Sequence, residues 1–144
     1  MRVLVDANLF LSFLLHPARE TAVSRVVRAA VARTFTLLVP EGLFEEIARV
    51  ASEKPYLAER IPAAELEELL GLLREVAEPV PFVSPPFPAV TRDPKDDYLI
   101  AHAVAGFANY LVTGDGDLLA LDRVETVHIV TASDFLARLD AGEP

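Results

Sequence analysis

Short apolar runs alternate along this chain with longer segments whose apolar residues recur every three or four positions. The runs predict buried strands, because they lack polar alternation: 3–6, 36–40, 81–83, 110–113 and 127–130. The longer segments predict helices: 8–14, 21–33, 41–53, 63–78, 93–107, 115–121 and 132–139. Strands that alternate with helices in this way predict an α/β fold with a mainly parallel central sheet and helices on both faces.

The proline-rich stretch at 79–94 interrupts this alternation with six prolines. We interpret it as an ordered, extended connection inside one domain, because neither side has enough apolar residues for a core of its own. With 144 residues and 52% hydrophobic residues, the whole chain can form one core. We therefore expect a single domain over 1–144, with a frayed tail at 139–144.

The composition excludes several classes of protein. The sequence has no cysteine, which rules out disulfides and thiolate metal sites and fits a cytoplasmic protein. The longest apolar stretch, 9–15, is too short to cross a bilayer, and the first residues do not form a signal peptide, so we expect no membrane partner. Scarce amide side chains and many prolines favour a thermophilic source, although a GC-rich genome would equally explain the excess of arginine over lysine.

The net charge of −9 argues against a broadly basic nucleic-acid-binding surface. A nucleic acid could still bind through a local basic patch, or through a cation held by acidic residues. One segment concentrates basic residues: Arg19, Arg25, Arg28 and Arg33. These arginines form either a solvated helix face or a ridge that contacts phosphates, and the sequence leaves both interpretations open.

Two acidic residues follow predicted strands. Asp6 ends the first strand, and Asp115 comes shortly after the strand at 110–113. Since parallel strands end at the same edge of a sheet, both carboxylates are expected at the ligand-binding edge. Each could alternatively serve only as a turn or helix-capping residue.

Helical spacing selects one acid from each of two acidic pairs. Leu43, Glu46 and Ile47 share the apolar stripe of their helix, so Glu46 is expected to face inward and Glu45 outward. Glu46 could also simply favour the helix dipole.

In the second pair, Asp96 lies in line with the apolar face of its helix, and Asp97 lies nearer its edge. We favour Asp96 as the inward acid and keep Asp97 as an alternative or supporting ligand. A capping box with Asp93, which should cap this helix, is the structural alternative for Asp96.

Converging carboxylates repel one another unless their pKa values rise or a divalent ion balances them. The candidate ligands are all oxygen, which selects Mg²⁺ or Mn²⁺, as one or two ions. Such an ion suits phosphodiester hydrolysis. Asn8, Thr113 and Asp117 could orient these acids or a water, or could serve only in turns.

Four segments resemble PIN-domain ribonucleases, and most closely the toxin components of toxin–antitoxin systems: VLVDANLFLSFLL, LFEEIARV, DPKDDYLIAHAVAGFANYLVTGDGDLL and VHIVTASDFL. The resemblance implies a PIN-like fold and an endoribonuclease that uses Mg²⁺ or Mn²⁺. It places Asp6, Glu46, Asp96 and Asp115 at the metal-ligand, catalytic positions, with Asp97 in place of Asp96 in some relatives. It places supporting polar residues at Asn8, Ser12, Thr113 and Asp117.

The resemblance also implies partners: an RNA substrate, a small antitoxin protein and a second copy of the chain in a homodimer. The rival interpretation is a catalytically weak or inactive module that binds RNA or an antitoxin. An aspartyl-phosphate phosphatase is disfavoured, because Asn8 stands where that chemistry needs a second aspartate.

Overall fold

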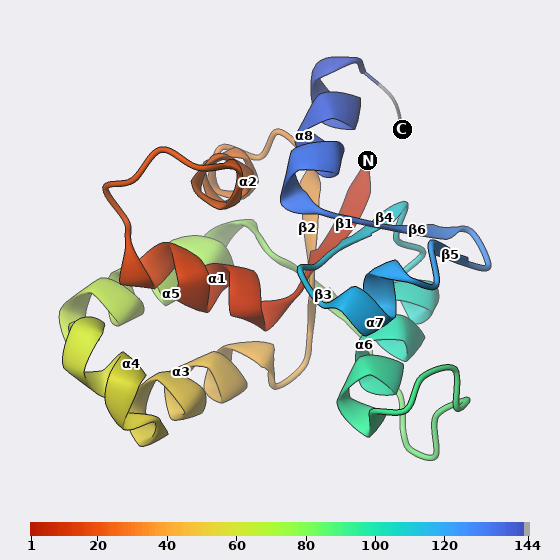
Figure 1. Cartoon of the computed structure of the whole chain (residues 1–144), viewed down its shortest axis with the longest axis horizontal. Helices are drawn as coiled ribbons and strands as arrows, with labels where there is room; N and C mark the ends of the chain where they lie inside the picture. The colour runs from red at the N-terminus through yellow and green to blue at the C-terminus, as the bar shows by residue number, and fades with distance from the viewer. Residues whose placement is uncertain (143–144) are drawn as a thin grey trace.

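The computed structural model describes residues 1–142, which form a six-stranded sheet covered by helices (Figure 1). All neighbouring strands are parallel except the last pair, β6 and β5, which is antiparallel. The strand order across the sheet is β3 (Glu78–Val80), β2 (Thr36–Pro40), β1 (Arg2–Val5), β4 (Tyr110–Val112), β6 (Val127–Val130) and β5 (Arg123–Val124). The expected α/β fold with a mainly parallel sheet is therefore confirmed.

Helices cover both faces of the sheet, as the sequence predicts. Figure 1 shows most of the helices on one side of the strands, with α6 and α7 on the other. The helices are α1 (Ala7–Leu15), α2 (Ala22–Val31), α3 (Leu43–Glu53), α4 (Pro55–Arg60), α5 (Ala63–Val76), α6 (Pro94–Ala105), α7 (Gly116–Leu119) and α8 (Ala132–Asp140).

The central strands are buried on both faces because successive side chains enter different cores. In β1, Val3 and Val5 pack into the larger core against α1, α2 and α8, and Leu4 between them packs into the smaller core with α6. Both cores are apolar, which explains the uninterrupted apolar run of this strand. The carboxyl ends of β1 and β4 lie side by side, with Val5 in register with Val112.

Three local predictions were wrong. The strand expected at 81–83 lies at 78–80, where it pairs with β2 at the edge of the sheet. An edge strand tolerates Pro79, which has no N–H to donate. The helix α4 was not predicted. It is separated from α3 by Lys54, which lies before Pro55 and is extended. The short strand β5 was missed as well.

The last helix continues to Asp140, which is further than the expected start of the frayed tail at 139. Residues 143–144 of that expected tail lie outside the described part of the chain. Among residues 1–142, no helix has both the length and the apolar character needed to cross a bilayer.

Candidate metal centre

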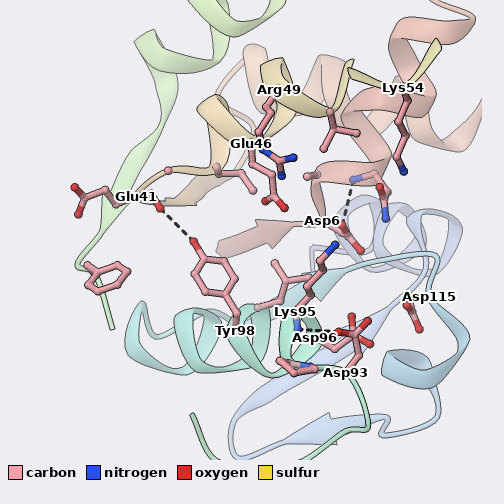
Figure 2. A pocket seen from close by; sticks show the side chains of 18 residues that line it. Asp6, Glu41, Glu46, Arg49, Lys54, Asp93, Lys95, Asp96, Tyr98 and Asp115 are labelled. Carbon is pink, nitrogen blue, oxygen red and sulfur yellow. Dashed lines mark hydrogen bonds between the residues drawn. The ribbon is translucent and has the colours of Figure 1, made fainter. Parts of the chain in front are cut away.

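The candidate site lies at the edge of the sheet where β1 and β4 end. The cavity there has a volume of about 640 Å³ and is lined by side chains from distant parts of the chain. Figure 2 shows carboxylates on opposite sides of it. Its acidic lining residues are Asp6, Glu41, Glu46, Asp93, Asp96 and Asp115. The four acids that the resemblance places at catalytic, metal-ligand positions thus all line one cavity.

Asp6 is buried and held by hydrogen bonds at both carboxylate oxygens. Its Oδ2 accepts from the Thr113 hydroxyl at 2.9 Å, and its Oδ1 accepts from the backbone N–H of Asn8 at 3.1 Å. Asp6 therefore also caps α1, so the capping alternative holds alongside its place in the cavity. The contact with Thr113 joins the ends of two neighbouring strands and fixes the orientation of this carboxylate.

Glu46 reaches the cavity from the first turn of α3. Gly42, with φ of +87°, turns the chain into this helix in a conformation that L residues rarely adopt. Glu46 is half-buried in the wall of the cavity, whereas Glu45 is exposed and lines a different depression. Helical spacing predicted Glu46 inward and Glu45 outward, and the structure places the two residues in the same way.

Asp96 lies buried in the cavity, and its pKa is raised from 3.8 to about 6. Desolvation is the largest cause, followed by the charges of Asp115 and Asp93 and then of Asp6 and Asp117. Asp93 caps α6 as predicted, through the N–H of Lys95 at 2.9 Å. The capping box does not form, because the Asp93 N–H donates to Thr91 instead.

Asp97 points away from this cavity and serves a different purpose. Its Oδ1 accepts three hydrogen bonds, from the N–H groups of Val90 and Thr91 and from the Thr91 hydroxyl, at 2.9 to 3.1 Å. Asp97 does not line the cavity. This side chain anchors the loop before α6, which favours Asp96 over Asp97 as the inward acid.

Asp115 reaches the cavity from the short connection after β4. Its Oδ1 caps α7 by accepting from the N–H groups of Asp117 at 2.8 Å and Leu118 at 3.3 Å. Its own N–H donates to the Thr113 hydroxyl at 3.1 Å. Thr113 therefore connects Asp115 with Asp6, and the capping alternative again holds beside the cavity position.

The other predicted supporting residues divide between the cavity and the outer surface. Asn8 lines the cavity. Ser12 is exposed on α1 and does not line it. Asp117 is exposed outside it and pairs with Arg92 at 3.3 Å, although its charge contributes to the raised pKa of Asp96.

Sequence reasoning missed several residues of the cavity. Arg49, Lys54 and Lys95 add positive charge to its lining, and Phe82 and Tyr98 add aromatic rings. The Tyr98 hydroxyl donates to the carbonyl of Glu41 at 3.1 Å, and its pKa is raised, first by burial and then by Glu46 and Glu41. The sequence contained one clue to these residues. It has only two lysines, Lys54 and Lys95, and both line the cavity.

The donor set fits a hard divalent cation. All its side-chain ligands are oxygens, and a bound cation would offset the desolvation and the neighbouring negative charges that together raise the pKa of Asp96. Within residues 1–142, however, no three His, Asp or Glu side chains are close enough to hold one ion together. Side-chain rotation toward the centre of the cavity is therefore needed for shared coordination.

The family model described as PIN domain matches residues 2–117. The chain therefore belongs to the PIN-domain family, which confirms the resemblance seen in the sequence. PIN domains are generally nucleases and generally use divalent metal ions.

The fold is also similar to a solved structure described as VapBC2 from Rickettsia felis bound to a DNA fragment from their promoter. The TM-score is 0.53 at 11% identity, and the match covers 90% of this chain and 97% of the other. A search of curated proteins finds no match by sequence.

Proposed function

We propose that this chain is an endoribonuclease that hydrolyses RNA phosphodiesters with Mg²⁺ or Mn²⁺ held by Asp6, Glu46, Asp96 and Asp115. One observation carries the proposal: these carboxylates come from four separate segments and line one cavity. The PIN-domain family of this chain supports the same chemistry, since PIN domains are generally nucleases that use divalent metal ions.

The side chains of the cavity would divide the work. A bound divalent ion stabilises charge on phosphate oxygens and lowers the pKa of a water. Thr113 keeps the Asp6 carboxylate in one orientation toward the cavity. One of these carboxylates, or Asp117, would receive the proton of the attacking water. No side chain needs to act as a covalent nucleophile in this scheme.

We further propose that the chain is a toxin component that pairs with a small antitoxin and forms a homodimer. The resemblance of the sequence segments to toxin components supports this assignment. The similar fold of VapBC2 from Rickettsia felis is consistent with it, at the level of the fold alone.

The Asp6→Asn variant tests the nuclease proposal. This change keeps the size of the side chain and removes its charge, so the fold should persist while Mn²⁺-dependent RNA cleavage falls by about 100-fold or more, as expected when a preorganised charged group is lost. Asp134→Asn, on the exposed first turn of α8, is the matched control and should cleave like the wild type. Cleavage by Asp6→Asn at the wild-type rate would refute the assignment.

A non-catalytic module that binds RNA or an antitoxin is the second candidate. The separation of the carboxylates favours it, since no three of them in residues 1–142 are close enough to share an ion. Titration with Mn²⁺ while following the melting temperature and RNA cleavage distinguishes the two candidates. The absence of cleavage of any RNA, with or without stabilisation by Mn²⁺, supports the module, and the appearance of both effects supports the nuclease.

A further inference from the structure

We infer that Tyr98 is a positioning residue: its hydroxyl joins α6 to the turn that begins α3, and so holds Asp96 and Glu46 where both can reach one divalent ion. This inference rests on the proposed function, because it concerns how the same site is assembled. Three observations carry it. The two helices pack into different cores, one hydrogen bond joins α6 to the turn beside the cavity, and the tyrosine ring is held in place by its neighbours.

The sheet separates α3 from α6. Leu43 of α3 packs into the larger core, whereas Leu99 of α6 packs into the smaller core on the other face. The acids that these helices carry must converge if they are to share an ion, because no three of them within residues 1–142 are close enough. A side chain moves its carboxylate only within its own length, so the separation of the two helix starts decides whether Glu46 and Asp96 can meet at one ion.

One hydrogen bond crosses from α6 to the start of α3. The Tyr98 hydroxyl donates to the carbonyl of Glu41 at 3.1 Å, and Figure 2 shows the ring extending from α6 toward this turn. Within residues 1–142, no other hydrogen bond joins α6 to the segment 41–53. Tyr98 lies in the turn of α6 that carries Asp96, and Glu41 directly precedes the helix that carries Glu46. The bond therefore joins the two backbone segments from which these acids project.

The turn at the start of α3 lacks a side-chain cap of its own. Gly42 occupies the N-cap position, and no side chain accepts a hydrogen bond from the first turn of this helix. A Cβ at Gly42 would meet no atom within 4 Å, so no packing holds this residue from that side. The Gly42 carbonyl accepts the Glu46 N–H at 3.0 Å. By fixing the adjacent carbonyl of Glu41, Tyr98 therefore acts on the position of Glu46.

The ring of Tyr98 is itself held by two other rings. Its centroid lies 4.2 Å from that of His102 and 5.8 Å from that of Phe87. His102 is fully buried, and its Nε2 accepts the N–H of Val83 at 3.1 Å, so the proton of this ring is on Nδ1, which donates to the carbonyl of Tyr98 at 2.8 Å. Because both nitrogens of His102 are engaged, its ring is a fixed support, and the Tyr98 hydroxyl loses little freedom when it bonds to Glu41.

Hydrogen–deuterium exchange of the metal-free protein tests the contact between the two segments. Tyr98→Phe keeps the ring and its packing and removes only the hydroxyl, so the variant should fold like the wild type. In EDTA, we expect the amides of residues 43–50 to exchange about 3- to 10-fold faster, the change that corresponds to one hydrogen bond. The amides of α6 should keep their rates. Tyr56→Phe is the matched control, because Tyr56 is 55% exposed on α4 and does not line the cavity.

Calorimetric titration with Mn²⁺ in the absence of RNA tests whether the contact serves the metal site. We expect Tyr98→Phe to weaken Mn²⁺ binding by about 3- to 10-fold, and Tyr56→Phe to leave it unchanged. A double-mutant cycle with Glu46→Gln shows whether Tyr98 acts through Glu46. Once Glu46→Gln has removed the charge that Tyr98 positions, adding Tyr98→Phe should weaken binding by less than about twofold further. Independent effects would multiply instead.

The Mn²⁺ dependence of RNA cleavage separates positioning from a direct part in the reaction. At limiting Mn²⁺, Tyr98→Phe should cleave more slowly than the wild type, because less of the variant holds the ion. At saturating Mn²⁺, its rate should return to within about twofold of the wild type, since the bound ion then keeps the acids together without the hydroxyl. A loss that persists at saturating Mn²⁺ would assign Tyr98 a contact with the substrate and overturn the positioning role.

Unchanged exchange in residues 43–50, or unchanged Mn²⁺ affinity after Tyr98→Phe, would overturn the inference. Multiplicative effects of Tyr98→Phe and Glu46→Gln would overturn it as well. The wild type reports on the proposed function separately. If it binds Mn²⁺ and cleaves RNA while Tyr98→Phe behaves identically, only this inference fails. If it binds Mn²⁺ more tightly than Tyr98→Phe does but cleaves no RNA, only the nuclease fails, and a wild type that binds no Mn²⁺ overturns both.

Discussion

The hydroxyl of Thr113 donates a hydrogen bond to Oδ2 of Asp6 at 2.9 Å, across 107 positions of the sequence. Both residues are buried, and each directly follows one of two adjacent parallel strands. The same hydroxyl accepts the N–H of Asp115 at 3.1 Å. One threonine thus connects two acids of the cavity, so its loss should affect both stability and the geometry of the site.

Thr113→Val tests this connection, because it keeps the shape of the side chain and removes the hydroxyl. We expect the free energy of unfolding to fall by about 1–3 kcal/mol, since a buried carboxylate oxygen and an N–H lose their partner. RNA cleavage should fall as well, because Asp6 is no longer held in one orientation. Urea unfolding and cleavage assays measure the two effects, and Thr113→Ser should restore most of both. A Val variant as stable and active as the wild type would contradict the connection.

Glu46→Gln and Glu45→Gln form a matched pair that tests the inward position of Glu46. The two residues are adjacent on α3, but only Glu46 lines the cavity. Excess Mn²⁺, at about 100 times its dissociation constant, should stabilise the wild type by about 2.7 kcal/mol. We expect Glu46→Gln to lose much of this stabilisation and of the cleavage, and Glu45→Gln to retain both. Thermal melts with and without Mn²⁺ measure the difference, and equal behaviour of the two variants would argue against a ligand role for Glu46.

Asp96 should make the metal-free protein less stable as the pH rises. Its pKa increases from 3.8 to about 6 on folding, so between these values the native state holds a proton that the unfolded state has lost. Stability therefore falls as the pH rises through this window, and the charged form remains costly above it.

Asp96→Asn should remove this dependence and stabilise the protein at neutral pH by about 1 kcal/mol, after allowance for solvent in the cavity. Urea unfolding in EDTA at a series of pH values from about 4 to about 7 measures the change. Matching slopes for the variant and the wild type across this range would show that Asp96 is not the titrating group.

Asp97→Ala should have the opposite effect on stability. It removes the acceptor for three hydrogen bonds from Val90 and Thr91, which costs about 2–3 kcal/mol. We expect faster proteolysis of the loop before α6, with Mn²⁺-dependent cleavage of RNA retained in the folded fraction. Asp97→Asn keeps a carbonyl acceptor and should recover part of the stability. A stable Ala variant without activity would instead support Asp97 as a ligand.

Local pattern predicted most elements because the strands have uninterrupted apolar runs and the helices have apolar stripes. It failed where a tertiary contact decides the local conformation. Pairing with β2 draws Glu78 out of the expected helix and into β3. The chain extends at Lys54 before Pro55 and then forms α4, a helix that the pattern did not predict. In the site, helical spacing separated Glu46 from Glu45 and favoured Asp96 over Asp97, but both aspartates are buried, and their hydrogen-bond partners distinguish their roles.

The sequence by itself determined the parallel α/β fold and the edge at which the acids gather, because burial on both faces and the ends of strands are properties of neighbouring residues. Helical spacing favoured Asp96 as the inward acid, but only the tertiary structure decided that Asp97 holds a loop, since this role depends on Thr91. It also decided that Lys54, Lys95 and Phe82 line the same cavity. Their meeting depends on how α3, α6 and the proline-rich connection pack together, which no local spacing encodes.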